Sequence, residues 1–333
     1  MRELHVTNLR IESFEDLRRV LDGTNTRTVP LGTGIPRGSI LQTAVGDVSL
    51  TAGELSAEIR TRGSIESSRL SLGMKLDSES THFSFRSGRE VLPGDVYALV
   101  RGDDVDYRVG GSLRYVFISL SPELLLRRGG EDAVSGNRGF WEQRRWFCAS
   151  PPIRALIVRS LETVVRQFSQ PDWPVSGPAI RQLQCDLVEP FLWGYLFCGR
   201  HAHERRPLAS SAIVRSVEGW VDGQPPESIH LADLCRALRL SRRTLQRAFT
   251  ETLGMGPARY LTLRRLAAVR AVLRESGPAE TTVTDAAIRH GFWELGRFAR
   301  DYQRLFGERP SQTLARGRWS RRESVPTWRK LHS

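Results

Sequence analysis

The feature that most restricts the fold of this chain is an internal repeat with a separation of 53 residues. Its matched pairs are Leu245 with Phe298, Arg247 with Arg300, Phe249 with Tyr302, Leu253 with Phe306, Gly254 with Gly307 and Pro257 with Pro310. Six matches at one offset are hard to obtain by chance. Each copy combines apolar residues at helical spacing with Gly and Pro, which punctuate helices. The repeat therefore predicts two copies of one unit: a helix, a tight turn and a second helix.

In the first copy, Ser241 is a natural N-cap for a second helix at about 242–252. The turn before it is expected at Arg239 and Leu240, after a helix with an apolar stripe through Leu231, Leu234, Cys235 and Leu238. Helical spacing buries Leu245, Ala248, Phe249 and Leu253. It leaves an open face of Arg243, Gln246, Arg247 and Thr250, with Arg242 at the start of the helix. Arg and Gln can bond base edges or phosphates, so this face is predicted to contact DNA.

In the second copy, the turn is expected at His290, Gly291 and Phe292, after an apolar stripe through Val283, Ala286 and Ala287. The following helix, 295–305, would bury Phe298, Tyr302 and Leu305. Its open face carries Arg297, Arg300 and Arg304, with Leu295 and Gly296 at its entry. In one helix alone, such arginines would indicate an ordinary solvated face. Two copies in register favour binding to DNA.

Between the copies, residues 257–275 form a third helical pattern, which begins with Pro257 and ends before Gly277 and Pro278. A helix of this length measures about 28 Å at about 1.5 Å per residue. Successive major-groove faces of a duplex lie about 34 Å apart. We therefore predict a rigid spacer that sets two reading helices on one side of DNA.

The distribution of charge supports a division into two domains. Residues 211–333 contain 22 Lys and Arg against 12 Asp and Glu, a net charge of +10, whereas residues 1–210 have a net charge of +2. The chain has only two lysines, Lys75 and Lys330. A coding bias would explain the use of Arg in place of Lys, but it would not explain the difference in net charge between the two parts. A basic domain beside a near-neutral one is typical of a phosphate-binding module attached to a different module.

The C-terminal 120 or so residues resemble the AraC/XylS family of transcription regulators. The resemblance rests on SRRTLQRAF at 241–249, GMGPARYL at 254–261, HGF at 290–292, FARDY at 298–302 and FGERPS at 306–311. It implies two helix-turn-helix motifs joined by a long helix, with RNA polymerase as a partner. The family's base-facing positions fall on Arg243, Gln246, Arg247, Leu295, Gly296, Ala299 and Arg300.

Two residues depart from the family's pattern. Arg239 stands where the family usually has a turn glycine, so the first turn must accommodate a side chain. Gly296 has no side chain with which to read a base, so the second helix is expected to depend on phosphate contacts and fit. The first motif is accordingly expected to read bases, and the second to hold the DNA backbone.

The N-terminal part is expected to be β-rich, with strands near 40–45, 55–59, 70–76, 96–100 and 115–120 separated by Gly and Asp turns. From about 152 to 199 the period becomes helical and predicts two helices, which either close this domain or pair it with a second copy of the chain. The Pro93-Gly94-Asp95 turn resembles that of a cupin-type barrel, the fold many members of the family use to sense small molecules. An ordinary hairpin connection would contain the same turn.

An alternative is a metal-dependent cupin enzyme, which needs several His and a carboxylate around its metal. His82 is the one histidine between residues 6 and 200, and His201 and His203 fall in an expected linker. Neither a phosphate-binding glycine loop nor a nucleophile elbow is found. The four cysteines, Cys148, Cys185, Cys198 and Cys235, lack zinc spacing and are expected to be reduced and buried. We therefore expect no enzymatic activity, cofactor or metal.

The sequence thus predicts an α+β multidomain protein: a β-rich, cupin-like sensor or dimerisation domain with two C-terminal helices (1–199), a linker (200–211), an all-α DNA-binding domain (212–318) and a basic tail (319–333). Without an apolar secretory leader or a membrane segment, it is expected in the cytoplasm. The expected function is sequence-specific transcription regulation that responds to a small-molecule effector. The alternative is a ligand-independent regulator controlled by a protein partner, and a homodimer remains open in both cases.

Overall fold

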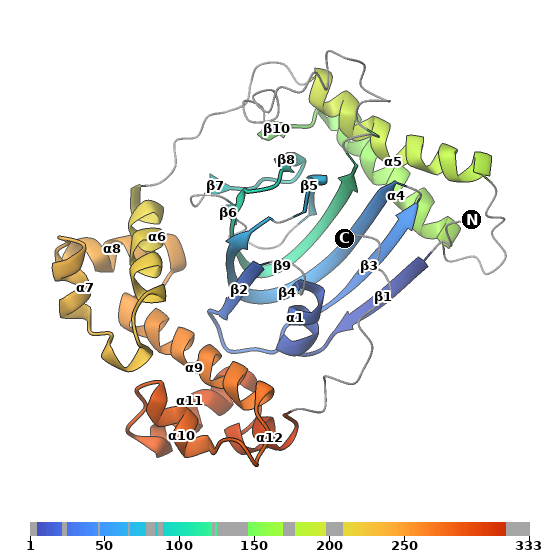
Figure 1. The fold of residues 1–333 in the computed structure, drawn as a ribbon. Coiled ribbons are helices and arrows are strands. Elements are labelled where there is room, and N and C mark those ends of the chain that lie inside the picture. Colours follow the sequence, from blue (N-terminus) through green and yellow to red (C-terminus); the bar gives the residue numbers. More distant parts are fainter. Residues whose placement is uncertain are drawn as a thin grey trace.

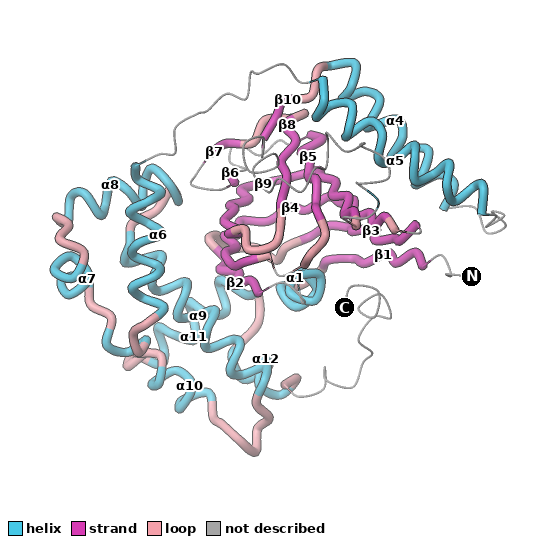
Figure 2. Tube along the Cα trace, turned by 45° about the horizontal axis from the view of Figure 1, so that its top comes forward, coloured by secondary structure: helices cyan, strands magenta, loops and turns pink. Residues whose placement is uncertain are grey.

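The computed structural model describes residues 5–21, 25–45, 47–65, 67–77, 84–85, 89–121, 124, 146–168, 177–197 and 209–317. Figures 1 and 2 show a curved sheet flanked by two long helices, and a separate group of helices formed by the C-terminal third of the chain. His82, His201, His203, Cys198 and the predicted basic tail lie outside the described residues.

The N-terminal part is built on an antiparallel sheet. Its elements are β1 (His5–Ile11), α1 (Phe14–Leu21), β2 (Asn25–Pro30), β3 (Arg37–Val45), β4 (Val48–Ser64), β5 (Leu70–Asp77), β6 (Ser84–Phe85), β7 (Arg89–Glu90), β8 (Asp95–Leu99), β9 (Asp104–Leu120) and β10 (Trp146–Cys148). The strand order is β1-β3-β4-β9-β5-β8-β10, with β2 paired to β4 and β6 paired to β9 and β7. Pairing among the described strands leaves β1 and β10 at separate edges. The predicted β-rich domain is confirmed, but its strands do not close into a barrel.

Strands β4 and β9 form the backbone of the sheet, because they pair along their whole length, from Val48 with Leu120 to Ser64 with Asp104. Side chains alternate between the two faces of a strand. The even-numbered residues Leu50, Leu72 and Ile118 belong to a core with helices α4 (Pro151–Phe168) and α5 (Gly177–Phe197). The odd-numbered residues Leu55, Ile59, Tyr97, Val109 and Leu113 form a second core on the other face, which also receives Leu17 of α1.

The C-terminal third contains only helices among its described residues. They are α6 (Ala209–Asp222), the short 3-10 helix η1 (Pro226–Ser228), α7 (Leu231–Ala237), α8 (Arg242–Leu253), α9 (Pro257–Glu275), α10 (Val283–Arg289), α11 (Leu295–Phe306) and α12 (Pro310–Ala315). Leu234, Leu245, Leu266, Phe298 and Leu314 contribute to one core that runs through both repeat units. Helix α9 lies between them (Figure 1). The two units therefore form one domain with a common core and are not independent domains.

Strand and helix boundaries differ from the sequence prediction at several places, and β1, α1 and β2 were not predicted. Gly53 lies within β4 and Gly110 and Gly111 lie within β9, although glycine was interpreted as a turn signal. A Cβ at Gly53 would lie 2.8 Å from the carbonyl oxygen of Ser39, so glycine here allows a close approach between strands. Helix α6 begins at Ala209, which places the last residues of the predicted linker in the helical part. No helix within the described ranges is long and apolar enough to cross a membrane.

Candidate DNA-binding surface

Helix α8 presents the first predicted reading face. It begins at the predicted cap, where the Ser241 hydroxyl oxygen accepts a hydrogen bond of 3.0 Å from the backbone N–H of Thr244. Gly254 ends the helix in the left-handed conformation, with φ of 69°. The inner side holds Leu245, Ala248, Phe249 and Leu253, all buried. All five predicted site residues are exposed: Arg242, Arg243, Gln246, Arg247 and Thr250.

Helix α11 presents the second predicted face in the same way. Gly307 ends it with φ of 73°, and Phe298, Tyr302, Leu305 and Phe306 form its buried side. Five of the predicted residues are exposed: Leu295, Gly296, Arg297, Arg300 and Arg304. Ala299 differs, because it is half-buried and packs against the shared core. Its methyl group therefore contributes to packing on its inner side.

The repeat acquires a physical explanation in the structure. The pairs Leu245 and Phe298, Phe249 and Tyr302, and Leu253 and Phe306 are all buried in the shared core. Gly254 and Gly307 end the second helices, and Pro257 and Pro310 begin the helices that follow. Gly254 and Gly307 are exposed but have no side chain, so Arg247 and Arg300 form the one matched pair with exposed side chains. Folding explains every other repeated position, so this arginine points to a contact outside the chain.

The arginines of both faces make only weak contacts within the described chain. Arg247 lies 3.9 Å from Glu251, and Arg297 lies 3.8 Å from Asp301, each one helical turn away. The two arginine side chains are 70% and 71% exposed. Exposed pairs of this kind contribute about 0.3–0.5 kcal/mol. A phosphate can therefore replace these carboxylates at little cost.

The turns that precede α8 and α11 each contain a residue in the left-handed conformation, but the residue type differs. Gly291 has φ of 77° in the second turn, whereas Arg239 has φ of 52° in the first and is the one non-glycine residue with positive φ among those described. The left-handed conformation costs an L-residue roughly 1–2 kcal/mol. The sequence therefore located this strained position correctly.

Replacing Arg239 with glycine is expected to raise the free energy of unfolding by about 0.5–1 kcal/mol, because relief of strain exceeds the greater flexibility of glycine in the unfolded chain. Urea denaturation of the full chain measures the change. The matched control is Gly291→Ala, which introduces the same strain and should lower stability. An Arg239→Gly variant less stable than the parent protein would contradict this account.

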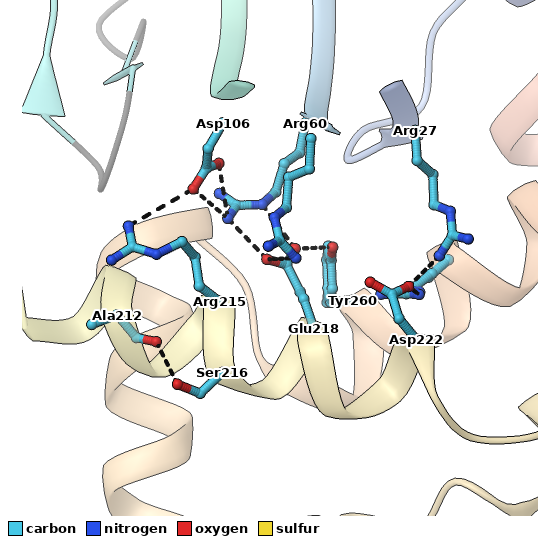
Figure 3. A network of polar contacts seen from close by, with 11 residues as sticks. Arg27, Arg60, Asp106, Ala212, Arg215, Ser216, Glu218, Asp222 and Tyr260 are labelled. Carbon is cyan, nitrogen blue, oxygen red and sulfur yellow. Dashed lines mark hydrogen bonds and ion pairs between the residues drawn. The ribbon is translucent and has the colours of Figure 1, made fainter. Parts of the chain in front are cut away.

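A buried ionic network connects the C-terminal helical domain to the sheet (Figure 3). The guanidinium of Arg60, on β4, donates from Nε to Glu218 of α6 at 2.8 Å and lies 3.1 Å from Asp106 of β9. The Tyr260 hydroxyl, on α9, donates to Glu218, and Arg62 lies 3.2 Å from the same carboxylate. The Arg60 and Glu218 side chains are only 3% and 1% exposed. This network was not predicted, because its charges lie far apart in the sequence.

The ionisation of the network follows from its burial and its charges. Burial alone would lower the pKa of the Arg60 guanidinium, but Glu218 and Asp106 outweigh it and raise that pKa. Burial raises the pKa of the Asp106 carboxyl, against the opposing charge of Arg60. Burial, together with the charge of Glu218, raises the pKa of Tyr260. Tyr260 therefore keeps its proton and remains a hydrogen-bond donor to Glu218.

The N-terminal domain also contacts the C-terminal ends of α8 and α11. At α8, Arg108 of β9 donates from Nη1 to the carbonyl oxygen of Thr252 at 3.0 Å. At α11, the ring of Phe14 meets the ring of Phe306 edge-on, with centroids 5.7 Å apart. Arg270 of α9 lies 2.7 Å from Glu15 and 2.9 Å from Glu308. The N-terminal domain thus contacts the C-terminal end of α8 through β9 and that of α11 through α1, and it leaves the predicted faces of both helices exposed.

The structure brings together no metal site within its described ranges: no three His, Cys, Asp or Glu side chains are placed to share an ion. Cys185 and Cys235 are half-buried free thiols. The exposed residue that sequence reasoning missed is Trp293, which is 73% exposed directly before α11. The sequence signal that could have identified it is a tryptophan shortly before Arg297, Arg300 and Arg304 on the predicted DNA-binding face.

Comparison with known proteins gives three findings. A family model described as a helix-turn-helix domain matches residues 234–316. The probable thc operon regulatory protein of Rhodococcus erythropolis is 32% identical over 158 residues, which are 46% of this chain and 47% of that protein. The XylDLEGF operon transcriptional activator 2 of Pseudomonas putida is 34% identical over 113 residues, which are 30% of this chain and 72% of that protein.

Among solved structures, a probable AraC family transcriptional regulator from Rhodopseudomonas palustris CGA009 is 37% identical, covers 32% of this chain and 98% of that chain, and gives a TM-score of 0.30. The match to the Rhodococcus protein spans about half of that relative's length. The match to the second Pseudomonas activator spans more than two thirds of its length. Because the chain contains this repeat with its two capped helices and shares these similarities, it belongs to the AraC/XylS family of transcription regulators.

Proposed function

We propose that this protein is a cytoplasmic, sequence-specific regulator of transcription that binds double-stranded DNA through α8 and α11. The observation that carries the proposal is the exposed arginine repeated in the two units, Arg247 and Arg300. Folding explains the other matched positions of the repeat but not this one. Helix α9, with 19 residues, is about 28 Å long and would set α8 and α11 into successive major grooves. RNA polymerase is the proposed protein partner on the promoter.

The two helices would have different tasks. In α8, the side chains of Arg243, Gln246 and Arg247 can each form two hydrogen bonds with one base edge. In α11, Arg297, Arg300 and Arg304 offer positive charge for the phosphates. The first unit would therefore select the sequence, and the second would hold the duplex.

Replacing Arg247 with alanine is expected to weaken binding to the natural operator by about ten-fold or more and to relax selection of one base pair, because a bidentate contact is worth about 1–3 kcal/mol. Replacing Arg300 should weaken binding to operator and to random DNA by a similar factor. Footprinting identifies the operator, and titration of labelled duplexes measures both affinities.

Arg10→Ala is the matched control, because it removes an exposed arginine from β1 in the N-terminal domain, outside α4, α5 and the helical domain. It should leave both affinities unchanged. If Arg247→Ala and Arg300→Ala also had no effect on either duplex, the proposed reading faces would be wrong.

We further propose that the N-terminal domain is a cupin-like sensor in which an effector lies against the sheet face turned away from α4 and α5. This face is apolar and aromatic, with Tyr97, Tyr107, Tyr115 and Phe117 around it. The contacts of Arg60, Arg108 and Glu15 with the helical domain offer a route from that face to the reading helices. Helices α4 and α5 are the proposed dimer contact, with the exposed Leu156 at its surface.

The second candidate is a regulator without a ligand, controlled by a protein partner. Thermal unfolding of the full chain with candidate small molecules separates the two, because a ligand that binds only the folded state raises its stability. A protein that melts at one temperature with every compound, but is recovered with a specific partner, would favour the second candidate.

A further inference from the structure

The turn of the second helix-turn-helix unit is one residue longer than that of the first. Helix α8 begins three residues after Arg239, the left-handed residue of its turn. Helix α11 begins four residues after Gly291, which has the same role. The longer turn contains Trp293 and Glu294, and Glu294 provides no side-chain cap for α11. The two units thus differ where their reading helices begin.

The longer turn exposes a small apolar surface, which we call the apolar lip and which consists of Trp293 and Leu295. Trp293 is 73% exposed and Leu295 is 40% exposed. Phe292, the residue before them, turns inward, with its ring centroid 5.0 Å from that of Phe298. Tryptophan buries a large apolar area when it finds a partner, and adjacent exposed apolar side chains mark surfaces of interaction.

Charge indicates which partner the apolar lip fits. The three exposed arginines Arg297, Arg300 and Arg304 follow it along the same helix. A polyanion complements this combination, and in DNA the phosphates flank the base edges of the major groove. The lip lies at the N-terminal end of α11, the end at which helix-turn-helix reading helices contact bases. The apolar lip would therefore contact the base edges at the bottom of the major groove.

The chemistry of the first turn of α11 restricts which base it accepts. Leu295 has no hydrogen-bonding group in its side chain, and Gly296 has no side chain at all. A Cβ built at Gly296 would meet no atom within 4 Å, so the helix is open to close approach here. Guanine, adenine and cytosine edges would lose water there without gaining a hydrogen-bond partner, which disfavours these bases. Thymine alone presents an apolar group, its C5 methyl, in the major groove.

We propose that the second unit reads thymine methyl groups through the apolar lip, so that it selects sequence without base-specific hydrogen bonds from Leu295 or Gly296. This proposal rests on the proposed function, because it requires α11 to lie in the major groove. It changes the role of the second unit, which would then contribute to selection through apolar contact and to affinity through its arginines.

The test replaces thymine with uracil, one position at a time, in the operator segment protected by the second unit. Uracil lacks only the methyl group, so base pairing is retained. At one or two positions, we expect affinity to fall about four-fold, the factor that corresponds to one buried carbon. The same substitution should have no effect for Leu295→Ala or Trp293→Ala at the position that each side chain covers. Both residues are exposed, and circular dichroism verifies that the variants fold.

The outcomes distinguish the proposal from its premise. Uracil without effect at every position, while Arg300→Ala still weakens binding, would overturn the reading of thymine and leave DNA binding by α11 intact. Arg300→Ala without effect would overturn the premise. If both lip variants bound DNA normally but lost transcription with purified RNA polymerase, the lip would dock a protein and the proposal would be wrong.

Discussion

Replacing Glu218 with alanine is expected to lower the free energy of unfolding by about 3–5 kcal/mol, the cost of leaving a buried charge without its partner. The change removes the carboxylate that receives hydrogen bonds from Arg60 and Tyr260 and lies beside Arg62. Arg60, only 3% exposed, would retain Asp106 alone. Urea denaturation followed by circular dichroism measures the loss.

The matched control is Asp233→Ala, which removes the carboxylate of an ion pair with Arg236 at 2.9 Å. Its side chains are 41% and 78% exposed, so the loss should remain below about 1 kcal/mol. Glu218→Gln should fall between the two, since it keeps an acceptor for Tyr260 and loses the charge. Equal stability of the Glu218 and Asp233 variants would show that the network contributes no more than a surface pair.

The affinity for operator DNA is expected to fall by about a thousand-fold or more between about 50 and about 200 mM salt. The reason is that binding at two successive grooves would involve roughly six to ten phosphate contacts, each of which releases condensed counterions. Fluorescence anisotropy across a salt series gives the slope of log affinity against log salt. Arg300→Ala combined with Arg304→Ala should reduce that slope by about two.

Arg10→Ala, in the N-terminal domain, serves again as the control and should leave the slope unchanged. A flat salt dependence in the parent protein would be incompatible with phosphate contacts from α11 and would remove the main support for its proposed role. A steep slope that the double variant did not change would assign the phosphate contacts to other arginines.

The sequence predicted the helical domain closely because its helices carry local punctuation. Pro257 begins α9, and Gly277 and Pro278 follow its end, so the predicted range 257–275 matches the observed helix. Ser241 and Gly254 delimit α8 in the same way. These signals depend on residues within a few positions of each other, which a sequence displays directly.

The sheet and the contacts between domains were harder to predict for the opposite reason. Gly53 and Gly111 fall between the predicted strands, where Gly and Asp turns were expected, but they lie in long strands that are defined by pairing with distant segments. Arg60 and Glu218 are 158 residues apart, so nothing local identifies them as partners. Likewise, the exposure of Trp293 depends on the length of its turn and on the inward rotation of Phe292.

Helix α9 has a consequence for which promoters such a protein could recognise. Because its side chains belong to the cores of both units, it cannot bend or stretch without disturbing Leu266 and Val269 in their shared packing. The two DNA segments that the protein recognises would therefore be separated by an invariant gap. New target promoters could arise by base changes within either segment, whereas insertion or deletion of a few base pairs between them would remove the promoter from control.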